Sequence, residues 1–218
     1  MRVVLLGAPN TGKGTYASRY LIDIYKIPHI STGDLFRDNI KNGTELGNNA
    51  REYIEAGKLV PDNITVGMLK ERLQEKDCRK GFFLDGFPRT VAQARALEEI
   101  TTIDAVLDFV ATEDTLLRRR TGRRICRGCG AIYHVTNIVP KKEGICDECG
   151  GEIYQREDDK PKAAKKRLKI YYKEIQPVID FYKIKGLLSE IDANLDVNDP
   201  KFHVIDDCRK VLDKLRGR

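Results

Sequence analysis

The chain has 218 residues, of which 41% are hydrophobic and 33% are charged, and its formal net charge is +6. This composition is typical of a water-soluble globular protein, and the length allows one substantial core with small inserted lobes. The apolar run at the start is too short for a membrane span or a signal peptide, so we expect a cytoplasmic protein without a membrane partner. A net charge of +6 suits anionic ligands but does not by itself indicate nucleic acid.

The chain opens with a predicted strand and a glycine-rich turn. The apolar residues 3–6 stop at Gly7, and Gly12 and Lys13 complete the spacing G-x-x-x-x-G-K of a P-loop, after which apolar residues recur at helical spacing. Glycines allow backbone N–H groups to converge on a phosphate, and the N-terminal end of the helix adds positive potential at the same place. Lys13 would reach the outer phosphates, and Thr15 has a hydroxyl for phosphate or hydrated Mg²⁺. We therefore predict nucleotide phosphate binding here rather than a plain turn between strand and helix.

The next part of the chain contains a predicted small lobe and a strand that ends in a carboxylate. Residues 27–30 are typical of a short strand, and segment 31–60 contains two short helices with few apolar positions, which indicates a small lobe packed on the main body. A helix begins at Pro61, and the buried strand 82–85 follows it. This strand ends in Asp85, and α/β sheets bind their ligands at the carboxyl ends of such strands.

From residue 92 onward, helices and strands continue to alternate. The expected elements are a helix over 92–100, a strand over 105–110, a helix from 113, a long helix from 161, a strand over 187–191 and a helix over 201–215. Strands that alternate with helices predict a parallel sheet with helices on both faces. The predicted fold class is therefore α/β, a P-loop NTPase-like three-layer fold with a central parallel sheet.

Four of the six cysteines form two pairs, Cys126-x-x-Cys129 and Cys146-x-x-Cys149, with sixteen residues between the pairs. This spacing is typical of a four-thiolate zinc site, and a disulfide framework is not expected in a cytoplasmic protein. Residues 122–155 alternate in short pieces between glycines, which predicts a small β-rich insert. A structural zinc ion would replace the hydrophobic core that so small a lobe cannot build. The alternative is a loop with four reduced thiols.

Several motifs occur in order along the chain, namely GAPNTGKGT, PHISTGD, LDGFPRT followed by Gln93, TGRR, and Arg156-x-Asp158-Asp159 with Arg167. Together they resemble the long-lid adenylate kinases over essentially the whole chain, and the paired cysteines resemble the members whose lid binds zinc. The resemblance implies a P-loop core, a helical NMP-binding lobe and a zinc-containing lid. The implied bounds are 1–30, 61–121 and 156–218 for the core, 31–60 for the lobe and 122–155 for the lid.

One position departs from the family pattern. The family usually has glycine where this chain has Asn10. Asparagine tolerates a left-handed backbone better than most residues do, so we expect a working loop with altered phosphate affinity.

The resemblance also implies an activity, the reversible transfer of a phosphoryl group from MgATP to AMP, giving two ADP. A monomer would perform it, with the lid and the NMP-binding lobe closing over the substrates. Its partners would be the nucleotides ATP, AMP and ADP, with Mg²⁺ accompanying ATP and Zn²⁺ held in the lid. Two alternatives stay open: a kinase for another nucleoside monophosphate, and a nucleic-acid-binding zinc-ribbon protein, which Arg123, Arg124 and Arg127 beside the cysteines would fit.

Phosphoryl transfer requires cations around a spreading negative charge, and the planar fork of arginine binds phosphate oxygens in pairs. By resemblance, the catalytic residues are Lys13, Asp85, Arg89, Arg124, Arg156 and Arg167, with Asp85 holding Mg²⁺ through water. The resemblance places ATP against Gly7, Ala8, Pro9, Asn10, Thr11, Gly12, Lys13, Gly14, Thr15, Arg119, Arg123, Tyr133 and His134. It places AMP against Thr32, Gly33, Arg37, Leu59, Val60, Gly86, Arg89, Gln93, Arg156 and Arg167. The metal ligands would be Cys126, Cys129, Cys146 and Cys149.

The two bases are expected to be recognised differently. Gln93 has an amide that can both donate to and accept from an adenine edge. By resemblance, Arg119 lies against the face of the donor base, and every base offers such a face. We therefore predict a strict preference for AMP as acceptor and weaker discrimination among triphosphates as donors.

Overall fold

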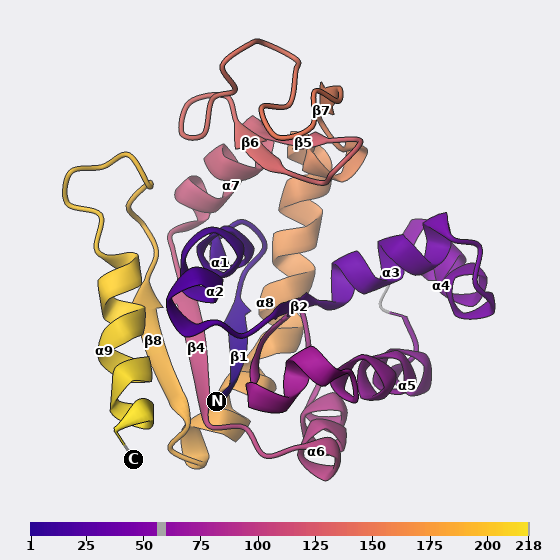
Figure 1. Ribbon diagram of the computed structural model, residues 1–218, viewed down its shortest axis with the longest axis vertical. Helices are drawn as coiled ribbons and strands as arrows, with labels where there is room; N and C mark the ends of the chain where they lie inside the picture. The colour runs from indigo at the N-terminus through magenta and orange to yellow at the C-terminus, as the bar shows by residue number, and fades with distance from the viewer. Residues whose placement is uncertain (56–59, 218) are drawn as a thin grey trace.

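A five-stranded parallel sheet forms the centre of the computed structural model, which describes residues 1–55 and 60–217 (Figure 1). Its strand order is β2-β3-β1-β4-β8. Val3, Val4 and Leu5 of the central strand are almost fully buried, because helices cover both faces of the sheet. The strands are β1 Arg2–Gly7, β2 His29–Ser31, β3 Phe82–Asp85, β4 Ala105–Val110 and β8 Leu188–Asp192.

The helices form the two outer layers, which confirms the predicted three-layer α/β fold (Figure 1). On one face, Leu212 of α9 packs in the same core as Leu5 of β1. On the other face, Leu97 of α6 and Val178 of α8 pack in the same core as Val4. The helices of this body are α1 Lys13–Tyr16, α2 Ile22–Tyr25, α5 Asp62–Leu73, α6 Val91–Ile100, α7 Glu113–Gly122, α8 Pro161–Ile184 and α9 Val204–Arg216, with a π-helical turn Ala17–Leu21 between α1 and α2.

Two elements begin two or three residues later than the sequence indicated. The strand expected over 27–30 starts at His29, since Pro28 has no N–H for a ladder and only its carbonyl accepts, from the Phe83 N–H at 2.8 Å. The last helix starts at Val204 rather than at residue 201. A turn in which the Asp199 carbonyl accepts from the backbone N–H of the residue three positions on occupies the intervening positions.

The predicted small lobe is built from α3 Thr32–Lys41 and α4 Glu45–Glu55. Ser31 caps α3 by accepting a hydrogen bond from the backbone N–H of the third helical residue at 3.3 Å. The lobe shares a small core with α5, in which Phe36, Ala50 and Val60 are buried together with Met68 of that helix. Figure 1 shows α3 and α4 projecting from the body, beyond β2.

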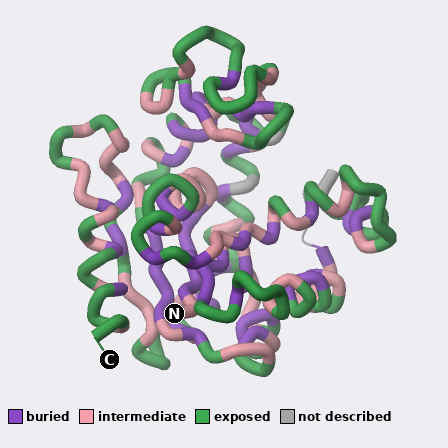
Figure 2. Tube along the Cα trace, in the orientation of Figure 1, coloured by how far each residue is buried: buried purple, intermediate pink, exposed green. Residues whose placement is uncertain are grey.

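The insert after α7 is a three-stranded antiparallel sheet of order β6-β5-β7, which confirms the expected β-rich character. Its strands are β5 Arg123–Cys126, β6 Ile132–His134 and β7 Ile153–Tyr154. Most of its chain is exposed or half-buried, whereas β1, β3 and β4 of the main sheet are largely buried (Figure 2). Within the described ranges, no helix combines the length and apolar content that crossing a bilayer requires.

Candidate active site

The P-loop joins β1 to the helix that begins at residue 13. Gly7 and Gly12 have φ values of +136° and +94°, and a Cβ on Gly12 would lie 2.6 Å from the ring of Tyr16. Only glycine fits there, because both the conformation and the space exclude a side chain. Asn10 has φ of 74°, so the asparagine adopts a left-handed backbone conformation, which this residue type tolerates better than most.

Lys13 and Asp85 meet at the carboxyl end of the sheet. Lys13 Nζ lies 3.8 Å from Asp85 Oδ1 and donates to the Ala8 carbonyl at 3.4 Å. His29 Nε2 lies 3.4 Å from the other oxygen of the same carboxylate. Burial alone would raise the pKa of Asp85, but Lys13, His29 and Arg89 outweigh burial and lower that pKa. Asp85 is therefore held as an anion, the form that binds a hydrated divalent cation.

Gln93 is buried in α6, where its amide binds two neighbours. Its Oε1 accepts from the Arg89 backbone N–H at 2.7 Å, and its Nε2 donates to Asp62 Oδ1 at 2.7 Å. Thr90 caps the helix by accepting from the Gln93 backbone N–H at 3.1 Å. A primary amide has two N–H groups and two lone pairs on its oxygen. These two contacts use one N–H of Gln93 Nε2 and one lone pair of Gln93 Oε1, and the amide has one more of each.

Thr32 and Gly86 lie between the lobe and the main sheet. The Thr32 hydroxyl donates to the carbonyl of Asp85 at 3.4 Å, and the same oxygen would lie 2.8 Å from a Cβ built on Gly86. Arg89 Nε donates to the Gly86 carbonyl at 3.0 Å. Thr32 and Arg89 thus both lie against the segment Asp85–Gly86, where β3 ends.

The remaining expected acceptor residues lie in or beside the lobe. Arg37 is half-exposed and forms an ion pair with Asp34 one turn earlier on α3. Gly33 lies beside this arginine, since a Cβ on it would be 3.2 Å from Arg37 Nη1. Val60 is buried in the lobe core, and Leu59 lies outside the described residues.

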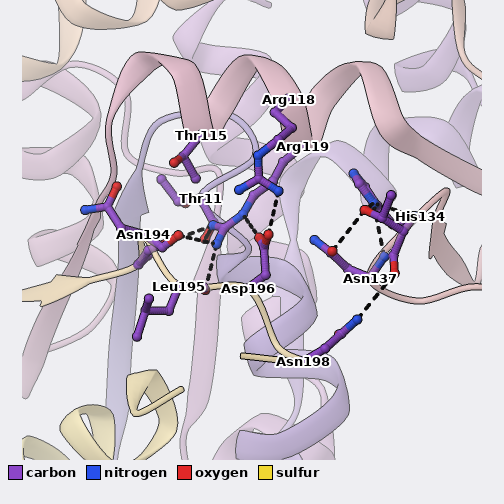
Figure 3. Close-up of polar contacts among 12 residues, drawn as sticks. Thr11, Thr115, Arg118, Arg119, His134, Asn137, Asn194, Leu195, Asp196 and Asn198 are labelled. Atoms are coloured by element: carbon purple, nitrogen blue, oxygen red, sulfur yellow. Dashed lines mark hydrogen bonds and ion pairs between the residues drawn. The ribbon is translucent and has the colours of Figure 1, made fainter. Parts of the chain in front are cut away.

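Arg119 is one of the few buried arginines, and all five of its N–H groups have partners (Figure 3). Its Nε donates to Asp196 Oδ1 at 2.8 Å. Its Nη atoms donate, at 2.7–3.2 Å, to the carbonyls of Thr11, Ala193, Asn194 and Leu195. Arg119 therefore ties the P-loop to the loop between β8 and α9, and these bonds lie in the plane of the guanidinium and use neither of its faces.

The same loop contacts the insert (Figure 3). Asp196 also pairs with Arg118, and although its burial alone would raise the pKa of this carboxyl, the two arginines lower it. Two residues on, Asn198 Nδ2 donates to the carbonyl of Thr136 at 3.3 Å. The Thr136 hydroxyl lies 3.0 Å from His134 Nδ1. The insert thus lies against the main body on the side of Arg119.

Tyr133 and His134 occupy interior positions of the insert. The hydroxyl of Tyr133 lies 3.4 Å from Cys146 Sγ and accepts from the Asp147 N–H at 2.8 Å. Burial of this phenol, together with Cys146, raises the pKa of Tyr133 to about 12. A Cβ on Gly122 would collide with the His134 imidazole, so this ring packs closely on the start of the insert. Burial also lowers the pKa of His134.

The arginines expected around the phosphates lie where the insert joins the body. Arg123 pairs with the buried Asp159, and Arg124 donates to the Thr121 carbonyl at 3.1 Å. Arg156 directly precedes the 3₁₀ turn Glu157–Asp159. Arg167 lies in α8, but its side chain, like that of Asp158, is outside the described part of the structure.

The four paired cysteines come together in the insert. Their Sγ atoms all lie within 4.8 Å of one another. The separations of 3.4 Å for Cys126–Cys149 and 3.5 Å for Cys129–Cys146 are too long for disulfide bonds. Four zinc–sulfur bonds of about 2.3 Å in tetrahedral geometry would place sulfurs about 3.8 Å apart, so this set fits zinc.

Both cysteine pairs are followed by the same turn. Gly130 and Gly150 have φ of +77° and +72°, and their N–H groups donate to the carbonyls of Cys126 and Cys146 at 3.1 and 2.9 Å. Two equivalent turns thus present their thiols to one point, which is an arrangement suited to a closed four-ligand metal site.

Three residues of the site were not predicted from the sequence. His29 contacts Asp85, Asp62 binds Gln93, and Asp196 binds Arg119. His29 had a signal, because it belongs to the quoted motif PHISTGD and to the strand predicted over 27–30. The two aspartates had none, since each acts on a residue distant in the sequence.

Comparisons with known proteins agree with this geometry. The family profile described as "Adenylate kinase" matches residues 5–187. Adenylate kinase of Caldicellulosiruptor bescii is 55% identical over 193 residues, covering 86% of this chain and 89% of that protein. The adenylate kinase of Desulfitobacterium hafniense is 53% identical over 94% of this chain and 97% of its own length, and that of Staphylococcus aureus is 50% identical over 99% and 100%. With a P-loop, a paired Lys13 and Asp85 and relatives of this similarity, the chain belongs to the adenylate kinase family.

Proposed function

We propose how the residues of this chain divide its reaction, the reversible transfer of a phosphoryl group from MgATP to AMP that yields two ADP. The observation that carries the proposal is the meeting of Lys13, Asp85 and Arg89 at the carboxyl end of the sheet. Lys13 follows β1, and Arg89 follows β3, the strand next to it. A phosphoryl group between donor and acceptor would therefore be within reach of both cations.

The donor triphosphate binds along the P-loop, residues 7–15, whose N–H groups and Lys13 hold its outer phosphates. Asp85 holds the hydrated Mg²⁺ that accompanies ATP, and this ion supplies positive charge next to the phosphate oxygens. Further cations come from the junction of body and insert, namely Arg123, Arg124, Arg156 and Arg167. Arg119 stacks on the donor base, and Tyr133 and His134 complete the donor side from the insert.

The acceptor binds between the small lobe and α6. Arg37 and Arg89 hold the phosphate of AMP, and Gln93 uses its remaining N–H and lone pair on the adenine edge. An amide held at both ends by neighbours presents a fixed pair of groups, which favours AMP over other nucleoside monophosphates. The pocket around the base is formed by Thr32, Gly33, Leu59, Val60 and Gly86.

We propose that the four cysteines hold a structural zinc ion, and that the insert over 122–155 and the lobe over 31–60 close over the substrates. Closure serves to exclude water, which would otherwise accept the phosphoryl group. The core would comprise 1–30, 61–121 and 156–218.

The protein would act as a cytoplasmic monomer without a nucleic-acid partner. The contacts of Arg127, beside the first cysteine pair, support the absence of nucleic acid: this arginine donates to Glu152 at 2.8 Å and stacks 3.9 Å from the Tyr154 ring. It is therefore engaged within the insert.

An acceptor assay tests the proposal. Initial rates with MgATP and each of AMP, CMP, UMP and GMP should show a clear preference for AMP. Arg89→Ala should lower kcat/KM by about 10²–10³-fold, because it removes a charge contact to the transferred group. Arg95→Ala changes an exposed arginine on α6, the helix that follows Arg89, and is the matched control that should keep normal rates.

Near-normal rates for Arg89→Ala would contradict the acceptor assignment. A preference for another monophosphate would favour a kinase that acts on that nucleotide. Salt-dependent binding of DNA without phosphoryl transfer would favour a nucleic-acid-binding zinc-ribbon protein.

A further inference from the structure

A charged residue stands inside a buried strand of the main sheet. Strand β4 has the sequence AVLDFV, and the strands of a parallel sheet with helices on both faces are normally apolar throughout. Asp108 of this strand is only 4% exposed. Its side chain belongs to the face covered by α6 and α8, because Asp108 is the register partner of Leu6, which packs in that core. The fold thus places a carboxylate where burial of a charge costs free energy.

No direct contact neutralises this carboxylate. Over the part of the chain that the structure describes, Asp108 has no hydrogen bond and no ion pair. Its neighbour across the sheet is a second acid, Glu190 of β8. Burial and Glu190 raise the pKa of Asp108, and together they outweigh the opposing effect of Lys13. A buried acid without a close partner destabilises the fold, and residues that break the local rules in this way occur mainly at functional sites.

Asp108 lines a cavity of about 220 Å³ between the end of β4 and α8. Apolar and aromatic side chains form much of its wall, among them Ile175 and the rings of Tyr171 and Tyr172, whose centroids lie 5.6 Å apart at an angle of 70°. The cavity opens to solvent beside Val110 and Tyr172, which are 40% and 48% exposed. An exposed apolar mouth therefore leads to a buried anion.

The walls and the charge together define the class of ligand that fits. An ionised carboxylate only accepts hydrogen bonds, and an ammonium group offers it both donors and a positive charge. Aromatic walls favour contact with a ring. A cavity of about 150 Å³ is enough to hold a benzene molecule. The volume of about 220 Å³ therefore has room for one ring with a short ammonium arm.

We propose that this cavity is a binding site for a small aromatic amine, whose ring packs between β4 and α8 and whose ammonium group pairs with Asp108. The site adjoins the P-loop, because Ala8 also lines the cavity, whereas Lys13, Asp85 and Arg89 do not. It is therefore separate from the place of phosphoryl transfer, and the inference goes beyond the proposed function without resting on it.

Calorimetric titration of the full-length, zinc-loaded protein with benzylamine at pH 7.5 tests the proposal. Benzylamine is a cation at this pH and should bind saturably to one site with a Kd of about 1 mM or tighter, as a ligand of this size can. Benzyl alcohol has the same ring but no charge, and it should bind at least about tenfold more weakly, because it lacks the charge-assisted hydrogen bond.

Variants of the cavity locate the binding. Asp108→Asn keeps the shape of the side chain but removes its charge, and it should weaken benzylamine binding at least about tenfold. Tyr172→Ala removes an exposed part of the wall and should weaken it about threefold. Glu174→Gln changes an exposed carboxylate of α8 outside the cavity and is the matched control without effect. Thermal melting of each variant reports whether it is folded.

The proposal is overturned if benzylamine shows no saturable binding, if benzyl alcohol binds equally well, or if folded Asp108→Asn binds the amine as wild type does. It is also overturned if a saturating non-hydrolysable ATP analogue with Mg²⁺ abolishes amine binding, because the amine would then occupy the nucleotide site. Should Asp108→Asn not fold, unchanged affinity in Tyr172→Ala overturns the proposal. Failure of the proposed function would instead appear as absent phosphoryl transfer between ATP and AMP in the wild-type protein.

Discussion

Asp108 is a buried carboxyl group close to the P-loop. It lies on β4 opposite Glu190 of β8 and lines a cavity of about 220 Å³ together with Ala8 and Tyr171. Burial and the Glu190 carboxylate raise the pKa of Asp108 to about 6, against the opposing effect of Lys13. Neither the strand pattern nor the family motifs indicated a shifted acid at this position. The reason is that residues of α8, which are distant in the sequence, line the same cavity as Asp108 at the end of β4.

A raised pKa makes the stability of the fold depend on pH. The unfolded chain has an aspartate pKa of about 3.9, so the folded state binds the proton more tightly. The stabilisation by this proton is complete below about pH 4 and is lost as the pH rises through about 6. We expect Asp108→Asn to exceed wild type in free energy of unfolding at pH 7.5 by about 1–3 kcal/mol, and to lose this advantage near pH 4. Urea unfolding at a series of pH values measures the difference, and parallel pH profiles for the two proteins would contradict the assignment.

The insert illustrates how a small element is stabilised. Its buried cluster consists of Cys126, Tyr133 and Cys146, with only a few partly buried apolar residues around them. Two of its members are cysteines of the four-thiol set. So little apolar surface cannot order an insert of this length, and the metal is expected to supply the missing free energy.

We therefore expect about one zinc ion per chain by metal analysis. Cys129→Ser removes an exposed ligand, so loss of packing contributes little to its effect. It should release the metal and lower the melting temperature by roughly 5–10 °C, and chelation should do the same. Val139→Ser changes another exposed residue of the insert and should leave both properties unchanged. Metal-free protein with an unaltered melting temperature would rule out a structural zinc.

The loop between β8 and α9 holds Arg119, the residue that we propose for stacking on the donor base. Its carbonyls at Ala193, Asn194 and Leu195 accept hydrogen bonds from Arg119, and Asp196 holds the same side chain. Because the hydrogen bonds of Arg119 lie in the plane of its guanidinium, this side chain would contact a base by stacking, and stacking does not depend on base identity.

We expect kcat/KM to differ by less than about a thousandfold between ATP and other triphosphates, with AMP held constant. Asp196→Asn should weaken the binding of all triphosphates to a similar degree, because it loosens Arg119 without changing any base contact. A preference for ATP beyond about a thousandfold, or roughly 4 kcal/mol, would show that the loop reads the base edge.

At the scale of the whole molecule, both extra lobes leave the sheet at the same edge. The small lobe follows β2, and the insert follows β4 and α7, so both start from carboxyl ends of parallel strands. Apart from its junctions with α7 and α8, the insert contacts the body where Arg19 donates to the Ile132 carbonyl at 2.9 Å and where Asn198 donates to that of Thr136. Both contacts are exposed, so each stabilises this arrangement only slightly.

A complex with a bisubstrate analogue tests closure. We expect both lobes to approach the P-loop in its crystal structure, and Arg124 and Arg156 to contact phosphate oxygens. The free protein in solution should be more expanded than the complex, as measured by small-angle scattering. A complex in which both arginines lie far from every phosphate would contradict the proposed closure.

The amino-acid sequence by itself determined the features that depend on neighbours in the chain. Gly12 and Lys13 in their spacing predicted the P-loop, and the alternation of apolar runs predicted the parallel sheet between two helical layers. The two C-x-x-C pairs likewise predicted a thiol cluster, because each pair brings its own turn and only one long-range contact had to be assumed.

Tertiary structure alone decided which distant groups share a charge or a hydrogen bond. Gln93 looked like a free reader of adenine, yet its amide is also held by Asp62, thirty-one positions away. Asp159 is shared by Arg120 and Arg123, which α7 and the start of β5 bring to it across the insert. Sequence periodicity reports which side of an element is buried, but not which element lies opposite. Burial makes the energy of a charge depend on that opposite partner, so these pairs could be recognised only in the folded chain.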